Sequence, residues 1–324
     1  MGNVVEKKAY AKVNLSLDIV GRREDGYHLV RMVMQSLDIA DELTFEKTEN
    51  GKIEVLLNSQ QNEGSEASAS ETTDKLGVVP LNEDNLIYKV AKLLLEKFVW
   101  EKNPEAGVKI TLTKNIPIAA GLAGGSSDAA ATFRGINELY ELNILDQDLM
   151  DMGVTLGADI PYCIMGGTAL SEGIGEKLTQ LPALPKCYFL VANPNISVST
   201  AEAYGGYDKL VESEEKIKHP DVDGQVDAIY SESLKGVTDL FKNVLEYVTS
   251  RNHEEIGILE KEMMDGGAIN AMMSGSGPTV FGVFEDADTA ENTKQKIEEK
   301  GLAKQVFVAR AVWYERKGKS RKAS

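Results

Sequence analysis

The chain is short of the residues that build metal sites, disulfide frameworks and membrane spans. It holds only two cysteines, Cys163 and Cys187, and three histidines among 324 residues. Two cysteines in this arrangement match neither a disulfide framework nor a zinc spacing, so we interpret them as reduced thiols of a cytoplasmic protein and expect no resident metal site. No apolar run is long enough to cross a bilayer, and the N-terminus lacks the apolar segment of a secretory signal.

Positive charge is also scarce. The sequence has 35 Lys and Arg residues against 51 Asp and Glu residues, which gives a formal net charge of −16. A surface this acidic repels polyanions, so we exclude nucleic acids and anionic membranes as main partners. A nucleotide ligand stays compatible with the charge only where local donors overcome the overall field. The chain is nevertheless 42% hydrophobic, which is ordinary for a globular protein with one large core or two modest ones.

The hydrophobic spacing predicts an α+β protein with two lobes and a basic tail, because strand and helix patterns alternate irregularly and the composition shifts near Pro185. We expect the lobes at residues 1–185 and 186–316, with the tail at 317–324. The predicted strands are 13–19 with one buried face, 37–45, 52–57, 108–112, 168–171, 177–178, 188–192, 271–273, 279–284 and 305–311. The predicted helices are 86–98, 149–156, 239–251, 256–264 and 287–300.

One segment of the first lobe shows neither pattern. Residues Gln60–Lys75 are rich in Ser, Glu, Ala and Thr and have no hydrophobic periodicity. Such a composition cannot bury enough apolar surface to offset the entropy of ordering the chain. We therefore predict a disordered loop or an insertion.

A glycine-rich stretch, PIAAGLAGGSSDAA, follows the strand at 108–112. Gly121, Gly124 and Gly125 permit close backbone approaches, and the Ser-Ser-Asp cluster at 126–128 followed by three alanines is typical of a capped helix start. Free N–H groups at the positive end of a helix form an anion site. The stretch has no lysine after its last glycine and so differs from a P-loop. A tight turn packed on a sheet is the alternative interpretation.

A second glycine-rich turn, Ser274–Gly277, joins two apolar strands. It could approach a phosphate chain or stabilise the first glycine loop, although a plain hairpin turn fits the pattern equally well. The preceding Met272 and Met273 are best interpreted as core residues.

Two charged residues complete a candidate reaction centre. Lys12 and Asn14 lie two residues apart on the first strand, so their side chains share a face. Asp159, in the sequence GADIPY, enters an apolar segment where a partly buried carboxylate needs a partner such as a lysine. The alternatives are an edge-strand lysine that opposes aggregation and a helix-capping aspartate.

Four motifs taken together resemble the GHMP kinase superfamily: AYAKVNLSLDIVGRREDGYH, PIAAGLAGGSSDAA, GADIPYCIMGG and MSGSGPTVF. They occur in the family's order and cover the chain from Ala9 to about Phe284. The sequence Gly26-Tyr27-His28 is similar to that of a family member that binds a cytidyl group. The resemblance implies an N-terminal lobe like ribosomal protein S5 domain 2, a ferredoxin-like C-terminal lobe, and ATP with Mg²⁺ between them.

The resemblance also implies roles for individual residues. Lys12 and Asp159 would be catalytic, and Asn14 would position the hydroxyl end of a cytidyl diphosphate sugar alcohol. Tyr27 and His28 would bind its base, together with Thr200 and Tyr204 in the sequence ISVSTAEAY. The ATP loop would comprise Pro117, Ile118, Ala119, Ala120, Gly121, Leu122, Ala123, Gly124, Gly125, Ser126 and Ser127.

The family pattern leaves several points open. Ala119, Ala120 and Ala123 stand where some relatives carry glycine, which is tolerable if these residues take ordinary backbone angles. A family kinase or decarboxylase acting on homoserine or a mevalonate derivative is one alternative function, and an inactive nucleotide-binding relative is another. Gly26-Tyr27-His28 disfavours the first alternative, and the presence of both Lys12 and Asp159 disfavours the second. We expect a monomer or a homodimer.

Overall fold

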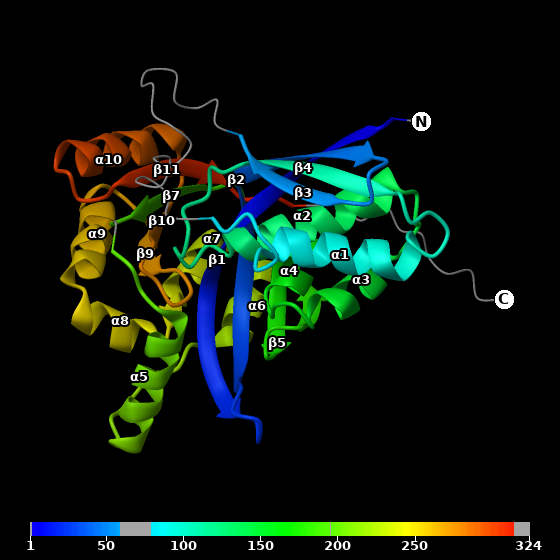
Figure 1. Cartoon of the computed structure of the whole chain (residues 1–324). Coiled ribbons are helices and arrows are strands. Elements are labelled where there is room, and N and C mark those ends of the chain that lie inside the picture. Colours follow the sequence, from blue (N-terminus) through cyan, green and yellow to red (C-terminus); the bar gives the residue numbers. More distant parts are fainter. Residues whose placement is uncertain (1, 59–78, 195, 314–324) are drawn as a thin grey trace.

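The computed structural model describes residues 2–58, 79–194 and 196–313 (Figure 1). Two β-sheets and the helices packed against them make up this part of the chain (Figure 1). The predicted segment Gln60–Lys75 and the basic tail 317–324 lie outside the described residues. Among the described residues, no helix is long and apolar enough to cross a membrane.

The first sheet is organised by one long hairpin. Strand β1 (Val4–Arg22) pairs antiparallel with β2 (His28–Thr48), and β2 is shared by two further strands. Its first part pairs with β5 (Thr168–Gly173), and its last part pairs with β4 (Gly107–Thr113). The outer strands are β3 (Ile53–Leu57), β6 (Lys177–Gln180) and the two-residue β8 (Lys242–Asn243).

Helices of the first lobe cover one face of this sheet (Figure 1). Helix α1 (Leu86–Phe98) matches its predicted bounds, and the Asn85 side chain caps it by accepting a hydrogen bond from the Ile87 N–H. Gly135 of α2 lets that helix pack closely, because a Cβ there would meet the Phe45 ring at 2.4 Å. The four helices of this layer are α1, α2 (Gly124–Leu139), α3 (Asp146–Gly153) and α4 (Ile160–Met165).

The second sheet has the ferredoxin-like arrangement that the motifs implied. Its four antiparallel strands lie in the order β11-β7-β10-β9, which a β-α-β-β-α-β chain produces. The strands are β7 (Tyr188–Asn193), β9 (Asn270–Met273), β10 (Val280–Phe284) and β11 (Gln305–Arg310). The helices are α5 (Thr200–Glu212), α6 (Val222–Tyr230), α7 (Leu234–Asp239), α8 (Glu246–Asn252), α9 (Glu254–Asp265) and α10 (Ala287–Glu299).

An apolar core joins the two sheets. Ala11, Val13 and Leu15 of β1 belong to the same buried cluster as Phe189 of β7 and Phe281 of β10. Each of these side chains is fully buried, so the contact between the sheets resembles a domain interior. The first and second sheets are therefore packed together by apolar contact, although the boundary at residue 185 stays a prediction.

The predicted helix at 239–251 is wrong. Helix α7 ends at Asp239, β8 pairs in parallel with Ser16 and Leu17 of β1, and α8 begins only at Glu246. The reason is tertiary: the buried Asn243 side chain donates hydrogen bonds to the Met273 and Gly275 carbonyls at 3.0 and 2.7 Å. These bonds fix an extended segment where the local sequence favours a helix.

Two smaller predictions need correction. Helix α3 begins at Asp146 rather than at residue 149, because two acidic residues in its first turn favour the helix N-terminus. The first strand does not have one buried face and one open face. Asn14, Ser16 and Asp18 are all buried, and a register shift between Asn14 and Ser16 interrupts the simple alternation of faces. Part of the cover over Asp18 is His219, whose Nδ1 lies 2.6 Å from it.

Two glutamates meet near the second glycine turn. Glu246 of α8 accepts a hydrogen bond from the Met273 N–H at 3.0 Å, and Glu260 of α9 hydrogen-bonds to Glu246. Burial, followed by the Glu246 carboxylate, raises the pKa of Glu260 to about 9. Burial also raises the pKa of Glu246. Glu260 therefore keeps its proton at neutral pH and can donate it in a hydrogen bond to the Glu246 carboxylate.

This pair predicts a pH-dependent stability. Because the pKa of Glu260 is higher in the folded than in the unfolded chain, the folded chain holds an extra proton between about pH 5 and 9. The free energy of unfolding should fall as pH rises through that range, by at most about 1.4 kcal/mol per pH unit from this proton. Glu260→Gln should remove the slope contributed by the pair.

Urea denaturation from pH 5 to 9 measures this slope. Glu298→Gln, an exposed change on α10, is the control and should follow the wild type. An unchanged slope in Glu260→Gln would contradict the raised pKa of Glu260.

Candidate functional site

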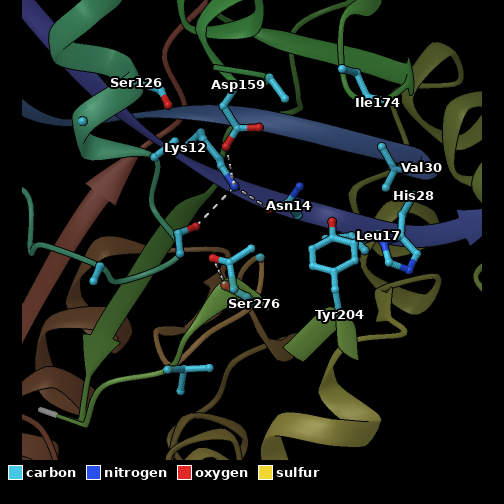
Figure 2. Close-up of a pocket in the computed structure, with 18 of the residues that line it drawn as sticks. Lys12, Asn14, Leu17, His28, Val30, Ser126, Asp159, Ile174, Tyr204 and Ser276 are labelled. Carbon is cyan, nitrogen blue, oxygen red and sulfur yellow. Dashed lines mark hydrogen bonds and ion pairs between the residues drawn. The ribbon is translucent and has the colours of Figure 1, made fainter. Parts of the chain in front are cut away.

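A cavity of about 1000 Å³ opens between elements of both lobes (Figure 2). Its wall combines β1, the start of β2, both glycine loops and the start of α5. Of the predicted site residues, it is lined by Lys12, Asn14, Tyr27, His28, Ala119, Ala120, Gly121, Ala123, Gly124, Gly125, Ser126, Asp159, Thr200 and Tyr204. Pro117 and Ile118 line a smaller neighbouring cavity of about 210 Å³, and Leu122 and Ser127 are buried.

Lys12 lies at the centre of the cavity wall. Its side chain is only 6% exposed, and its Nζ donates to Asn14 Oδ1 at 2.7 Å and to the Gly121 carbonyl at 3.3 Å. The pairing of β1 with β2 shifts register between Tyr10 and Lys12 and again after Asn14. Such irregularities re-aim side chains next to active sites. The alternative of an exposed edge-strand lysine is therefore wrong.

Asp159 faces Lys12 across the cavity wall (Figure 2). Its Oδ2 lies 3.8 Å from Lys12 Nζ, and its side chain is 34% exposed. Asp159 holds the N-cap position of α4 but accepts no capping hydrogen bond. Its carboxylate is thus directed to the lysine and the cavity, where it could accept a proton from a bound hydroxyl.

The start of α2 differs from the sequence prediction. The helix begins at Gly124 with Ala123 as its N-cap and has no side-chain cap, so the predicted capping role of the Ser-Ser-Asp cluster is wrong. Ser127 instead donates to the Tyr10 carbonyl at 2.6 Å, which ties the helix to β1. Ser126 remains at the cavity (Figure 2). The uncapped N–H groups are left for a ligand.

Two alanines of the loop have unusual backbone angles. Ala119 and Ala123 have φ values of 53° and 55°, in the left-handed region where Gly121 also lies. The condition under which alanine is easily tolerated, ordinary backbone angles, is therefore not met at these two residues. A left-handed non-glycine residue costs about 1–2 kcal/mol. The fold therefore maintains the loop's shape against local strain.

The second glycine turn contacts the first glycine loop. Ser274 Oγ donates to the Gly121 carbonyl at 3.1 Å, the same oxygen that Lys12 approaches. The turn also joins the antiparallel strands β9 and β10. The two interpretations of this turn, as a hairpin connection and as a support for the first loop, therefore both hold.

The far end of the cavity is aromatic (Figure 2). The rings of His28 and Tyr204 lie 4.9 Å apart, and Tyr27 is 60% exposed at the tip of the β1–β2 hairpin. Burial, with the Asp159 charge, raises the pKa of the Tyr204 hydroxyl, which stays neutral. Thr200 Oγ1 lies 3.1 Å from Ser276 Oγ, so α5 also contacts the second glycine turn.

A buried ionic cluster beneath the first loop escaped the sequence analysis. Lys114 Nζ hydrogen-bonds to Asp41 and, at 2.8 Å, to Asp128. Burial and the Asp41 charge raise the pKa of Asp128, whose Oδ1 has no partner among the described residues. Lys114 lies three residues before Pro117, so the sequence does show a lysine close to the glycine loop. Nothing in the sequence pairs this lysine with Asp41, which lies 73 residues away.

The described residues contain no group of three or more His, Cys, Asp or Glu side chains that could hold a metal ion by themselves. Asp159 and Ser126 nevertheless present oxygen atoms to the same cavity. Mg²⁺ is often held by one carboxylate together with phosphate oxygens of a substrate. The donor set therefore fits Mg²⁺ that arrives with a nucleotide. Both cysteines are free thiols, as expected.

Comparison with known proteins decides the family. The models "GHMP kinases N terminal domain" and "GHMP kinases C terminal" match residues 85–167 and 225–303. The chain is 44% identical over 308 residues to a 4-diphosphocytidyl-2-C-methyl-D-erythritol kinase of Lachnoclostridium phytofermentans, covering 95% of this chain and 97% of that protein. This chain belongs to the GHMP kinases, within the 4-diphosphocytidyl-2-C-methyl-D-erythritol kinase family.

Further relatives agree with this assignment to the GHMP kinases. A protein of Lachnospira eligens with the same description is 44% identical over 303 residues, covering 94% of this chain and 96% of its own. A crystal structure of a 4-(cytidine 5'-diphospho)-2C-methyl-D-erythritol kinase superposes with a TM-score of 0.74 at 29% identity, covering 95% of this chain and 99% of the other. The two-lobe GHMP kinase fold predicted from the motifs is thus confirmed.

The contact between the glycine loops of this GHMP kinase yields a prediction. A Cβ on Gly121 would lie 2.3 Å from the Ser274 carbonyl, and its φ of 74° disfavours any side chain. Gly121→Ala should therefore lower the thermal midpoint by several degrees and weaken ATP binding.

Gly125→Ala is the matched control for stability, because a Cβ there meets only a Leu86 methyl at 4.0 Å and the φ is ordinary. Calorimetric unfolding and ATP titration measure the two effects. Equal stability of both variants would contradict the tight contact.

Proposed function

We propose that this chain transfers the γ-phosphate of ATP to the 2-hydroxyl of 4-diphosphocytidyl-2-C-methyl-D-erythritol. The relatives that are 44% identical over nearly their full length are described as kinases of this compound. The observation that carries the proposal is the composition of the cavity. One space of about 1000 Å³ joins the Lys12–Asp159 pair to an aromatic end, so a single elongated substrate can reach both.

ATP is the phosphate donor of GHMP kinases, and the first glycine loop is its proposed binding site. The N–H groups at the start of α2 are uncapped and open to the cavity. The loop itself carries no cation, and the chain as a whole has a net charge of −16. Within the chain, the positive charge facing the phosphates would therefore come from the helix N-terminus and from Lys12 of β1.

Phosphoryl transfer requires alignment and charge stabilisation more than covalent chemistry from the protein. Lys12 would neutralise charge between the acceptor oxygen and the transferred phosphate. Asp159 would orient the hydroxyl and accept its proton. Asn14 accepts a hydrogen bond from Lys12, so it fixes the ammonium group and would also contact the hydroxyl end of the substrate.

Mg²⁺ is proposed as the accompanying cofactor, held by Asp159 or Ser126 together with phosphate oxygens. When bound, it would neutralise charge on the transferred phosphate. The remaining stabilisation falls to Lys12 and the backbone N–H groups of the loop.

The aromatic end would bind the cytosine base. Tyr27 offers an exposed ring, and stacking on an aromatic side chain contributes about 1–3 kcal/mol per base. His28 and Tyr204 form the adjacent wall, and Thr200 follows along α5. We further propose a cytoplasmic location and a monomeric or homodimeric state.

The catalytic proposal is tested with Asp159→Asn. Removal of the proton acceptor should lower kcat by about 10²–10⁴-fold while the amide preserves the side-chain shape. Coupled ATP-consumption kinetics with the cytidyl substrate measure the change. Asp227→Asn, exposed on α6, is the matched control and should retain full activity. Wild-type kcat in Asp159→Asn would remove this residue from the mechanism.

Substrate choice is tested with a panel of acceptors. We expect turnover with 4-diphosphocytidyl-2-C-methyl-D-erythritol and none with homoserine, mevalonate or phosphomevalonate.

Tyr27→Ala should raise KM for the cytidyl compound about 10- to 100-fold with little change in kcat, because stacking acts equally on bound substrate and transition state.

Tyr230→Ala is the control for that variant, since Tyr230 is equally exposed, at 59%, but lies on α6. Turnover of another acceptor instead of the cytidyl compound would leave the fold standing and refute the base-binding role.

A further inference from the structure

Asp208 is a residue of α5 that neither the motifs nor the proposed mechanism uses. Its two carboxylate oxygens have different partners on the β1–β2 hairpin. Oδ1 lies 2.7 Å from His28 Nε2, and Oδ2 lies 3.2 Å from Arg22 Nη1. The carboxylate thus connects the second lobe to the base-binding end of the cavity.

The arrangement of α5 explains why Asp208 reaches this position. Thr200, Tyr204 and Asp208 follow at intervals of four residues, so they lie along one face of the helix. Thr200 contacts Ser276. Tyr204 contacts the His28 ring, and Asp208 contacts His28 Nε2. This helical face therefore runs from the second glycine turn to the end of the hairpin.

A carboxylate can only accept hydrogen bonds, and this fact assigns the proton of the neutral His28 ring. Because Asp208 accepts at Nε2, that nitrogen carries the hydrogen and Nδ1 is left as a bare acceptor. Arg22 agrees with the assignment, since a guanidinium can only donate to Asp208 Oδ2 and so also treats the carboxylate as an acceptor. The side chain of His28 is 14% exposed, so water competes little for the ring.

We infer that Asp208 is a specificity-determining positioning residue that selects cytosine over uracil through the tautomer of His28. A bare Nδ1 can accept a hydrogen bond from the exocyclic amino group of cytosine. Uracil presents a carbonyl oxygen at the same position, which leaves two acceptors facing each other. The inference deepens the proposed function and rests on it, because it requires the pyrimidine to bind beside His28.

The substitution Asp208→Asn should keep the contact with Arg22 but reverse the direction of the hydrogen bond with His28. Arg22 is a donor only, so the amide oxygen should face Arg22 and the amide NH₂ should face His28. His28 Nε2 must then accept, and its hydrogen moves to Nδ1. The altered ring would donate to a base edge, as uracil requires. Glu212→Gln, an exposed change at the end of the same helix, is the matched control.

Binding of CDP and UDP by isothermal titration calorimetry tests the selectivity without turnover. We expect the wild type and Glu212→Gln to bind CDP about 30-fold or more tightly than UDP, as sites with a directed polar group do. In Asp208→Asn this ratio should fall about 10-fold or more. A preserved CDP preference in Asp208→Asn would overturn the role of Asp208 and leave the proposed function intact. Failure of the wild type to prefer CDP would overturn both.

The tautomer is measured independently of any ligand. The chain has three histidines, so the ring ¹⁵N resonances of His28 can be assigned with single His→Gln variants. We expect the wild-type ring to carry hydrogen on Nε2 alone, and Asp208→Asn to carry it on Nδ1. A wild-type ring protonated on Nδ1, singly or in addition to Nε2, would overturn the inference.

Discussion

The carbonyl of Gly121 is the point on which the site depends. Lys12 of the first strand and Ser274 of the second lobe both donate to it, at 3.3 and 3.1 Å. A buried ammonium needs acceptors and a counter-charge; this oxygen and Asn14 Oδ1 accept its hydrogen bonds, and Asp159 at 3.8 Å is its ion-pair partner. The requirement fixes the first glycine loop, the second turn and the lysine relative to one another. The cavity therefore has a charged end before any ligand enters.

Apolar packing makes this polar arrangement possible. The buried cluster between the sheets holds β1 against the second lobe, so Asn243 can reach the backbone of the second glycine turn. Both alanines with left-handed backbone angles lie in the first loop beside this contact. A stable core compensates for local strain at a functional loop, which is the usual location of such strain.

Helix α5 connects the two ends of the cavity. It contacts the second glycine turn through Thr200 and the hairpin tip through Asp208. The aromatic end and the glycine-loop end of the cavity thus share one rigid element of the second lobe. Under the proposed function, this link would hold an elongated substrate, bound at its base, with its hydroxyl end at a defined distance from Lys12.

The sequence by itself determined the elements whose signals are local. The helix at 86–98 followed from its apolar spacing, and the order of motifs was enough to predict the two-lobe fold. Lys12 and Asn14 could be placed on one face because strand periodicity is a local property. Only the tertiary structure decided the extended segment at Asn243, the start of α2, the Lys114–Asp128 cluster and the His28–Asp208 pair. Each of these depends on hydrogen bonds between residues far apart in the chain, and propensity carries no information about such partners.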